Sequence, residues 1–284
     1  MRPLRLNVGG SRIGEQPGLA KGTRLDLVLV DRGLAPSRER ARALILAGQV
    51  TVDSQVVSKA GAPVAAHTRV ELAVPDHPYV GRGGVKLAHA LDTFAIDPQG
   101  RRALDVGAST GGFTDVLLRR GAASVIALDV GRGQLDWRLR TDSRVLVREG
   151  VNARALTPDD VPHQVSLVTI DVAFISLRHI LPAVTAGLKG SRSGLTVPPF
   201  LEPAADVVAL VKPQFEAGRN EVGRHGIVSD PAVHAAVIAR VTEAAAACGL
   251  TRVAMTPSAI TGATGNQEFF LHLRAHGRIR CALP

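Results

Sequence analysis

The sequence feature that most constrains the fold is a glycine-rich turn set between an apolar run and a helical pattern. The apolar run 103–106 predicts a buried strand, and the pattern 113–120 predicts a helix. Glycine suits the turn because a backbone without Cβ atoms can bend sharply and come close to a bound ligand. Free N–H groups at the helix N-terminus favour a polar or anionic ligand there. Strand, turn and helix together predict a site for a nucleotide-like ligand, with an ordinary tight turn as the alternative.

The next predicted strand narrows the choice of ligand. The turn is neither a Walker A motif nor a clean GxGxxG motif, since Ala108 and Ser109 stand where dinucleotide sites usually have glycine. The strand 125–129 ends in Asp129, about 20 residues after the turn, where such folds hold ribose hydroxyls. Asp105 beside the turn would repel a pyrophosphate but could receive the ammonium group of a methionine moiety. These features favour S-adenosylmethionine over a dinucleotide.

Further cofactor contacts are expected at the ends of later strands. Asn152 follows the third predicted strand, where it either hydrogen-bonds an adenine edge or caps a helix. Asp171 follows the fourth, at the carboxyl edge of the sheet where α/β folds bind ligands. The residues expected to bind the cofactor are Asp105, Gly107, Ser109, Thr110, Gly111, Gly112, Phe113, Asp129, Asn152 and Asp171.

Length and charge bound the class of protein. The 284 residues suffice for one large and one small domain, and they carry a net charge of +9. This basic excess indicates a polyanionic partner, with nucleic acid favoured over a membrane. No apolar run approaches the about 18 residues of a membrane span, and the basic segment 1–22 lacks the apolar core of a secretory signal. Cys248 and Cys281 form no disulfide framework, so the expected location is the cytoplasm.

Residues 24–74 predict a small α+β domain of two helices and short strands. The second helix starts after Ser37, a residue type suited to an N-cap, and ends at Gly48. The order RLDLVLVDRGLAPSRERARALILAGQVTVDSQVVSKAG resembles the alpha-L RNA-binding module first known in a small-subunit ribosomal protein. The resemblance implies recognition of structured RNA by its shape and phosphates. The residues expected to contribute are Arg24, Arg38, Arg42 and Lys59.

Two lysines and two acidic residues fall at the ends of predicted elements on the cofactor side of the sheet. Lys86 lies in the first turn of a predicted helix, an unfavourable place for a cation. Asp171 and Lys212 each follow an apolar strand, and Glu268 precedes the last predicted strand. Conflicts between residue type and local preference collect at functional sites. No His/Cys/Asp cluster in the sequence suggests a metal, and none is expected.

Six motifs, in order, resemble those of the TlyA family of rRNA 2′-O-methyltransferases, also called hemolysins, whose catalytic domain is related to FtsJ-type RNA ribose methyltransferases. The motifs are GRGGVKL, LDVGASTGGFTD, ALDVGRGQLDW, TIDVAFISL, LVKPQFEAG and GNQEFFLHLR. The resemblance implies a Rossmann-like α/β methyltransferase domain that uses S-adenosylmethionine, with rRNA or ribosomal subunits as partner and cytidine ribose as the acceptor. It also implies a catalytic tetrad, formed by Lys86, Asp171, Lys212 and Glu268. Arg82 is expected as one more RNA contact.

The resemblance also sets the expected roles and boundaries. Lys212 is expected to act as general base or to orient the ribose 2′-hydroxyl, which is a poor nucleophile at neutral pH. Gly81 and Ala173 stand where the family usually has serine, and neither belongs to the tetrad. The expected parts are a flexible tail 1–22, an RNA-binding domain 23–74, a linker 75–81, a methyltransferase domain 82–276 with a loop insertion at 189–203, and a tail 277–284.

Three alternatives compete with this interpretation. One is an RNA-binding assembly factor without catalytic activity, which an intact tetrad and cofactor turn disfavour. Another is a membrane-active protein, although the sequence shows no basic amphipathic helix with large apolar residues. The third is a DNA-base methyltransferase, whose usual Asn/Asp-Pro-Pro-aromatic motif is absent because Asp171-Val172-Ala173-Phe174 lacks the prolines.

Overall fold

A computed structural model describes residues 22–46, 48–72, 77–186 and 200–276 of the chain. The chain divides into two compact units, one ending at Asp76 and the other beginning at His77, and each is described by itself. The expected tails, apart from Gly22, and most of the expected insertion 189–203 lie outside the described residues.

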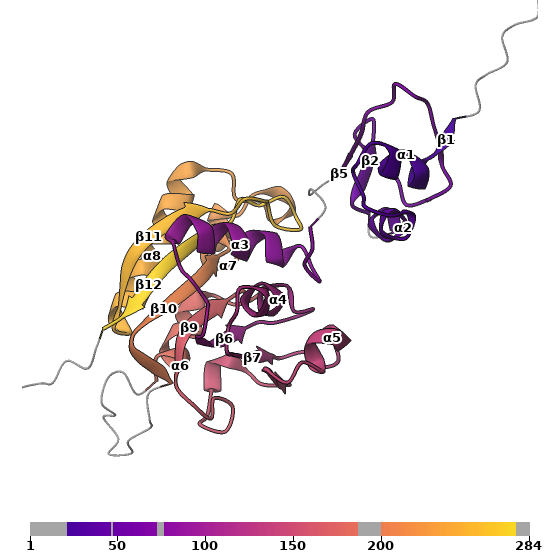
Figure 1. The fold of residues 1–284 in the computed structure, drawn as a ribbon. Coiled ribbons are helices and arrows are strands. Elements are labelled where there is room, and N and C mark those ends of the chain that lie inside the picture. Colours follow the sequence, from indigo (N-terminus) through magenta and orange to yellow (C-terminus); the bar gives the residue numbers. More distant parts are fainter. Residues whose placement is uncertain (1–21, 47, 73–76, 187–199, 277–284) are drawn as a thin grey trace, which may run out of the picture. The chain divides into compact units, whose positions relative to one another are not determined.

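The N-terminal unit combines two helices with short antiparallel strands (Figure 1). Its elements are β1 (Thr23–Arg24), α1 (Leu25–Asp31), α2 (Arg38–Leu46), β2 (Val50–Val52), β3 (Gln55–Val56), β4 (Pro63–Val64) and β5 (Val70–Leu72). The hydroxyl of Ser37 accepts a hydrogen bond from the Arg40 amide at 3.2 Å, so the predicted start of α2 is confirmed. Leu25, Leu29 and Ile45 are fully buried and join the two helices in one core.

The second unit is built on a seven-stranded sheet of order β11-β12-β10-β9-β6-β7-β8. The strands are β6 (Arg102–Val106), β7 (Ser124–Asp129), β8 (Val145–Glu149), β9 (Val165–Ile170), β10 (Leu201–Val211), β11 (Leu250–Pro257) and β12 (Phe269–Ala275). Strands β6 to β10 run parallel to one another, whereas β12 is antiparallel to both β10 and β11. The expected Rossmann-like α/β fold is confirmed.

Helices cover both faces of this sheet (Figure 1). Alternate residues of β7 separate to the two sides, with Ile126 packed in one core and Val125 in the other. On one side lie α3 (Gly83–Phe94) and α4 (Gly112–Arg119), and on the other lie α6 (Leu181–Val184) and α8 (Pro231–Ala247). Two single-turn helices, α5 (Trp137–Arg140) and α7 (Pro213–Glu216), follow β7 and β10. No helix among the described residues is both long and apolar enough to cross a membrane.

Two segments differ from their expected form. The apolar strand expected before Lys212 is β10, which begins as early as Leu201. Its pairing with β9 shifts register between Leu201 and Asp206, where Ala204 has a φ of +60°. Residues 201–203 are therefore strand rather than inserted loop. The stretch expected as a linker contributes His77 onward to the second unit, in which the Val80 amide donates to Asp115 Oδ2 at 2.9 Å.

Candidate active site

The glycine-rich turn after β6 is shaped by two residues with left-handed backbone. Gly107 has a φ of +86°, and a Cβ on it would overlap the carbonyl oxygen of Asp171. Gly111 has a φ of +97° and is the N-cap residue of α4. A side chain is disfavoured at both positions, because left-handed backbone strains other residues and the space at Gly107 is already filled. The turn can therefore run directly beneath the end of β9.

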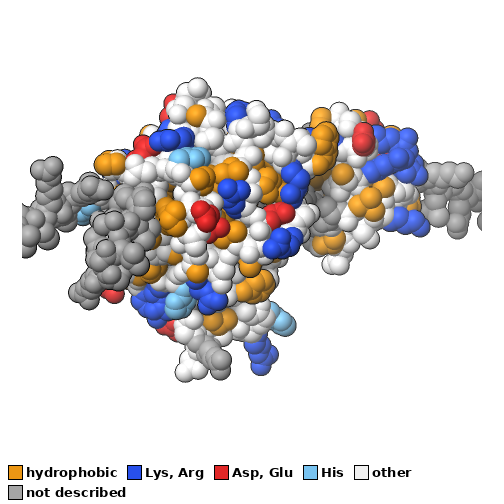
Figure 2. Space-filling view, turned by 90° about the horizontal axis from the view of Figure 1, so that it is seen from below, with side chains coloured by type: hydrophobic (Ala, Val, Ile, Leu, Met, Phe, Trp, Pro, Cys, Tyr) orange, Lys and Arg blue, Asp and Glu red, His pale blue; other side chains and the backbone are white. Residues whose placement is uncertain are grey.

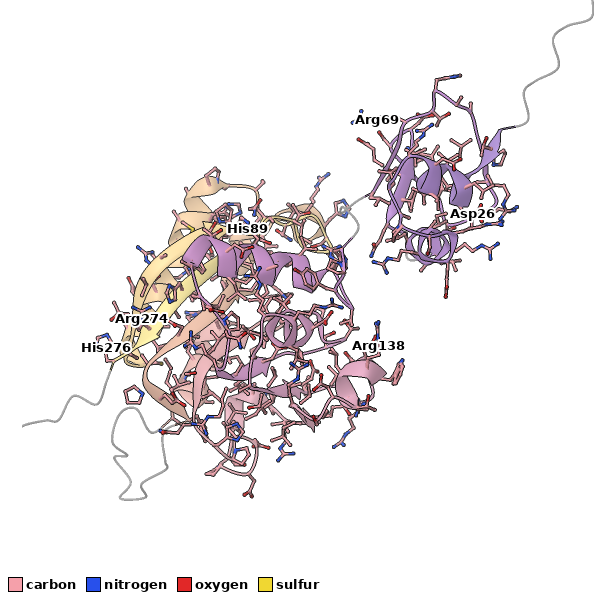
Figure 3. The ribbon with its side chains drawn as sticks, in the orientation of Figure 1. Asp26, Arg69, His89, Arg138, Arg274 and His276 are labelled. Atoms are coloured by element: carbon pink, nitrogen blue, oxygen red, sulfur yellow. The ribbon has the colours of Figure 1, made fainter. Side chains whose placement is uncertain are left out.

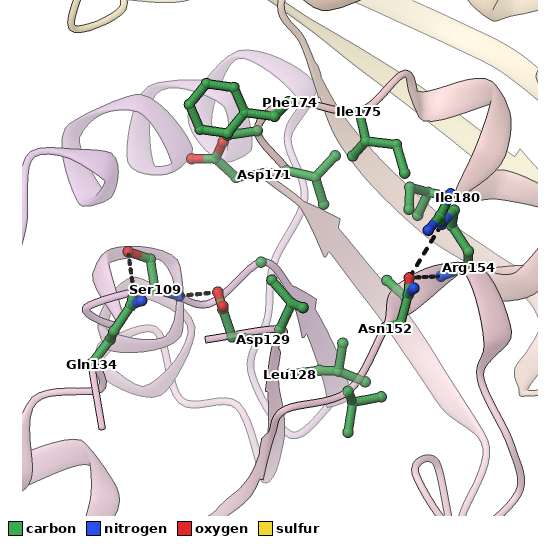
Figure 4. Close-up of a pocket in the computed structure, with 16 residues that line it drawn as sticks. Ser109, Leu128, Asp129, Gln134, Asn152, Arg154, Asp171, Phe174, Ile175 and Ile180 are labelled. Carbon is green, nitrogen blue, oxygen red and sulfur yellow. Dashed lines mark hydrogen bonds between the residues drawn. The ribbon is translucent and has the colours of Figure 1, made fainter. Parts of the chain in front are cut away.

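A cavity of about 530 Å³ opens where β6, β7, β8 and β9 end (Figure 4). Most of its polar lining comes from residues that the sequence singled out, namely Ser109, Asp129, Asn152 and Asp171. Gln134 adds a further polar side chain. Gly107 also lines it, and apolar contacts come from Leu128, Ile175 and Ile180. A cavity of this size, mostly apolar with a few convergent polar groups, suits a ligand of nucleoside size.

Asp129 and Asn152 both use part of their hydrogen-bonding capacity within the chain. Asp129 accepts from the Ser109 amide at 2.8 Å and from the Gly131 amide at 2.7 Å, so its carboxylate is fixed beside the turn (Figure 4). Asn152 Oδ1 accepts from the Arg154 amide at 3.1 Å and caps the short 3₁₀ helix Ala153–Ala155. The capping role and the position on the cavity wall are therefore both observed for Asn152, and its amide N–H₂ group remains available as a donor.

The other expected cofactor residues lie away from the cavity wall. Asp105 is fully buried and accepts hydrogen bonds from the hydroxyls of Thr114 at 2.6 Å and Thr169 at 2.9 Å. Burial raises the pKa of Asp105 to about 6, and the nearby charge of Asp171 adds to this. Phe113 packs in the core against Phe270. The remaining three do not line the cavity either; these are Thr110, Gly111 and Gly112.

The four residues of the expected tetrad form two ion pairs. Lys86 Nζ lies 2.5 Å from Glu268 Oε2, and both side chains are buried. Lys212 Nζ lies 2.5 Å from Asp171 Oδ1, and both remain slightly open to solvent. Buried charges need such partners, because an unpaired charge of this kind costs several kcal/mol, on the order of 3–5.

The strand register explains why the two pairs meet at one edge of the sheet. Asp171 and Lys212 follow the parallel strands β9 and β10, so both stand at the carboxyl edge. Because β12 is antiparallel to β10, its beginning lies at this same edge, and Val211 pairs with Phe269. Lys212 and Glu268, one residue beyond that pair on each strand, therefore stand opposite each other. Lys86 reaches Glu268 from α3, on the face of the sheet that α3 covers.

The loop before β12 is held by contacts that the sequence did not reveal. The fully buried Asn266 accepts from the Val228 amide and donates to the Gly226 carbonyl, each at 2.9 Å. Arg82, expected to contact RNA, donates to the Thr261 carbonyl at 2.6 Å and so ties the start of α3 to this loop. These contacts fix the approach to Glu268.

Phe174 is the most notable residue that the sequence reasoning missed. Its side chain is 92% exposed, its backbone has a φ of +63°, and it lines the cavity three residues after Asp171. Its ring lies 5.3 Å from that of Phe215, centroid to centroid. An aromatic residue in a hydrophobic run is usually predicted to be buried in the core, so no sequence signal distinguished Phe174 from a core residue.

The expected RNA-binding residues of the N-terminal unit are exposed or half exposed. Lysine and arginine side chains gather on this unit in the space-filling view (Figure 2). Arg24, Arg38 and Arg42 all contact Asp26, which the sequence reasoning did not single out. Lys59 is exposed on the segment that follows β3.

Comparison with known proteins finds similarity over nearly the whole chain. Residues 79–275 match the family described as FtsJ-like methyltransferase, and residues 23–70 match the S4 domain. A Mycobacterium tuberculosis protein named 16S/23S rRNA (cytidine-2'-O)-methyltransferase TlyA is 46% identical over 90% of this chain and 91% of its own length. The Bacillus subtilis protein YqxC, named for a proposed rRNA methyltransferase activity, is 44% identical over 91% and 88%. A hemolysin-named structure from Streptococcus thermophilus, 39% identical, covers 90% of this chain and 89% of its own with a TM-score of 0.68.

Proposed function

Because the chain belongs to the FtsJ-like methyltransferase family, in its TlyA group, we propose that it methylates the 2′-hydroxyl of a ribose in ribosomal RNA. Cytidine is the proposed acceptor, since the Mycobacterium tuberculosis relative is named for that nucleotide. The observation that carries the proposal is the meeting of Lys86, Glu268, Lys212 and Asp171 at the sheet edge that also bounds the cavity.

S-adenosylmethionine is the proposed methyl donor. The cavity of about 530 Å³ fits a ligand of this size, and Gly107 leaves room for a close approach of the backbone. Asp129 would hold the ribose hydroxyls, and Asn152 and Ser109 would supply further polar contacts. When bound, the donor supplies a methyl group already activated by its sulfonium. The chain's own residues must then orient the acceptor hydroxyl and receive its proton.

Lys212 is the residue we assign to the acceptor hydroxyl, either as general base or as the group that orients it. Two features support this role. Its Nζ atom is held 2.5 Å from Asp171 Oδ1, and Asp171 lines the cavity. Lys86 and Glu268 supply a second fixed ion pair beside it, so the hydroxyl meets preorganised charges and little water.

Recognition of the acceptor is assigned to two surfaces. Phe174, with 92% of its side chain exposed at the cavity, offers an aromatic face on which an unpaired base can stack. The S4 unit, with Arg24, Arg38 and Arg42, is assigned to phosphates of folded RNA. Such a substrate places the activity in the compartment that holds ribosomes, which we take to be the cytoplasm.

Substitution of Lys212 tests the proposal. In the purified protein, Lys212→Ala is expected to lower methyl transfer to rRNA by about 100-fold or more, because it removes the group that acts on the hydroxyl. Binding of the same RNA is expected to remain, since Lys212 is not among the assigned RNA contacts. Transfer is measured with labelled S-adenosylmethionine and 16S and 23S transcripts, and the modified nucleotide is mapped as a 2′-O-methyl.

The matched control is Arg102→Ala. Arg102 forms an ion pair with Glu202 at 2.8 Å but stands at the start of β6, at the opposite edge of the sheet. This variant should transfer methyl groups like the wild type. Near-normal turnover by Lys212→Ala would overturn the assigned role. Wild-type protein that binds rRNA without modifying it would favour the assembly-factor alternative.

A further inference from the structure

Asp26, labelled in Figure 3, belongs to the N-terminal unit, and its buried carboxylate is the common partner of three arginines. Arg24 donates from Nε to Oδ1 and from Nη2 to Oδ2, each at 3.0 Å. Arg38 Nε donates to Oδ2 at 3.0 Å, and Arg42 Nε donates to the same oxygen at 3.2 Å. The three arginines come from β1 and from α2, so one side chain of α1 connects separate segments.

The exposure of these side chains is sharply divided. Asp26 is 0% exposed, whereas the side chains of Arg24, Arg38 and Arg42 are 46%, 48% and 52% exposed. Each guanidinium has five N–H donors in a rigid plane, and the contacts to Asp26 use one or two of them. Asp26 therefore fixes each guanidinium group through its Nε, while about half of each side chain stays exposed and keeps further donors of the kind that bind phosphate oxygens.

The charges of the cluster formed by Asp26 and its three arginines favour an anionic partner such as a phosphate. Arg38 and Arg42 are one helical turn apart on α2, where like charges repel. The hydrogen bond from Arg24 lowers the pKa of Asp26 well below its usual value despite burial, and those from Arg38 and Arg42 add to this. Asp26 is therefore charged at neutral pH. The cluster keeps a net charge of +2, which comes from three arginines and one aspartate.

We propose that Asp26 is a positioning residue for RNA binding, which holds three guanidinium groups in the arrangement that RNA phosphates meet. The inference rests on the proposed function in that its ligand is ribosomal RNA. Its physical basis is preorganisation, because a long side chain loses conformational entropy when it is ordered on binding and Asp26 orders three of them beforehand. A negative residue thus strengthens binding to a polyanion.

Asp26→Asn separates positioning from simple charge. The variant adds one positive charge to the unit, so electrostatic attraction alone predicts tighter binding of rRNA. Positioning predicts the reverse, with a dissociation constant about tenfold higher as the arginines lose their shared acceptor. The slope of log affinity against log salt should stay near the wild-type value because every arginine remains. Arg38→Ala, in contrast, should weaken binding and lower that slope by about one.

The matched control is Glu71→Gln, which changes the charge of the same unit by the same amount. Glu71 pairs with Arg69 at 2.7 Å in an exposed contact far less enclosed than that of Asp26. This variant should bind rRNA as tightly as the wild type or more tightly. Asp26→Asn should also be nearly silent when Arg24, Arg38 and Arg42 are all alanine, since interacting residues are not additive.

The experiment measures binding of 16S and 23S transcripts across a salt series, together with methyl transfer at saturating RNA. For Asp26→Asn, the KM for RNA should rise about tenfold while kcat stays within about twofold of the wild type. Circular dichroism reports whether the unit is folded. If Asp26→Asn does not fold, Arg38→Lys and Arg42→Lys keep the charge but lose the Nε donor, and should weaken binding at an unchanged salt slope.

A folded Asp26→Asn variant that binds rRNA as tightly as the wild type overturns the inference and leaves the proposed function intact. So does wild-type affinity in both lysine variants. Absence of methyl transfer by a wild-type protein that binds rRNA overturns the proposed function instead, while the binding comparison still decides the role of Asp26. A wild type that does not bind rRNA overturns both.

Discussion

Asp105 shows how far a single residue can depart from what its motif suggests. It precedes the glycine-rich turn, and the sequence suggested a direct contact with the methionine end of the cofactor. In the structure its oxygens face the hydroxyls of Thr114 and Thr169 inside the protein. The carboxylate therefore ties α4 and β9 to the end of β6, and any influence on a ligand passes through the charge or through the turn that it supports.

The protonation of Asp105 gives a prediction about stability. Its folded-state pKa of about 6 lies above its ordinary value of 3.8, so the folded protein binds more protons than the unfolded chain between these values. The stabilising contribution is fully present below about pH 4 and is lost as pH rises through 6. Asp105→Asn removes this dependence, so the variant should gain stability relative to the wild type between pH 4 and 7. Thermal unfolding of both proteins across that range measures the difference.

Titration of Asp105 is revealed by how the stability difference between variant and wild type changes with pH, and not by the stability of either protein at one pH. The amide of the Asp105→Asn variant offers one acceptor oxygen where the native carboxylate offers two, and the variant can be less stable at every pH for that reason. A difference in melting temperature that stays constant from pH 4 to 7 would show that Asp105 does not titrate there. Asp97→Asn is a suitable control, since Asp97 lies in the turn after α3 and accepts only from the Gln99 amide at 2.9 Å.

At the level of elements, the loop between β9 and α6 is held by a buried carboxylate. Glu216 at the end of α7 accepts from the Ser176 hydroxyl at 2.5 Å and from the Leu177 amide at 2.6 Å. Burial raises the pKa of Glu216. We call these hydrogen bonds of Glu216 to Ser176 and Leu177 the clamp. Since Phe174 lies two residues before Ser176, the clamp restrains the segment that carries the exposed ring.

Weakening the clamp should reduce binding of the acceptor RNA more than it reduces the stability of the fold. Glu216→Gln keeps the shape of the side chain but replaces charge-assisted hydrogen bonds with neutral ones of about half the strength. The KM for rRNA is expected to rise by about threefold to tenfold with a small change in melting temperature. Phe174→Ala should raise the same KM with the clamp intact, and the double variant should be less than additive. A wild-type KM in Glu216→Gln would show that the clamp does not act on the acceptor.

The sequence predicted the elements better than their assembly. The start of α2 was predicted correctly, because Ser37 is a residue type suited to an N-cap and its hydroxyl does accept from the Arg40 amide. Lys86 was singled out because a cation in the first turn of a helix conflicts with local preference, and the family resemblance joined it to Asp171, Lys212 and Glu268 in a tetrad. The place of β12 was not predictable, because its insertion between β11 and β10 depends on pairing with β10, which is distant in the chain. The exposure of Phe174 and the arginine contacts of Asp26 also arise only from tertiary packing.

At the scale of the whole catalytic unit, Asp206 organises the sheet edge opposite the cavity. It lies in β10 and is contacted by Arg101 at 2.9 Å, His272 at 2.8 Å and Arg274 at 3.0 Å, which precede or belong to β6 and β12. Burial alone would raise the pKa of Asp206, but the hydrogen bonds from these three residues hold it well below its usual value. One carboxylate thus connects three segments of the sheet.

This depressed pKa predicts sensitivity to acid. The stabilising contribution of Asp206 is present above its unfolded value near pH 4 and is lost as pH falls through the lower folded value. Asp206→Asn should therefore lower the free energy of unfolding by about 2 kcal/mol at pH 7, with a smaller difference at pH 3. Denaturant unfolding at the two pH values checks this. Equal destabilisation at both would mean that lost packing, rather than charge, accounts for the change.

The antiparallel strand β12 has a consequence for how the protein comes into being. Both of its neighbours, β10 and β11, precede it in the chain, so during translation they emerge while the space between them is still empty. Glu268 arrives together with that final strand, and until then Lys86 lacks its carboxylate. A nascent polypeptide halted before β12 would contain most of the residues that line the cavity, but it would lack the ion pair between Lys86 and Glu268. The charge arrangement at the carboxyl edge of the sheet would in this way be completed only after β12 has been synthesised and has paired.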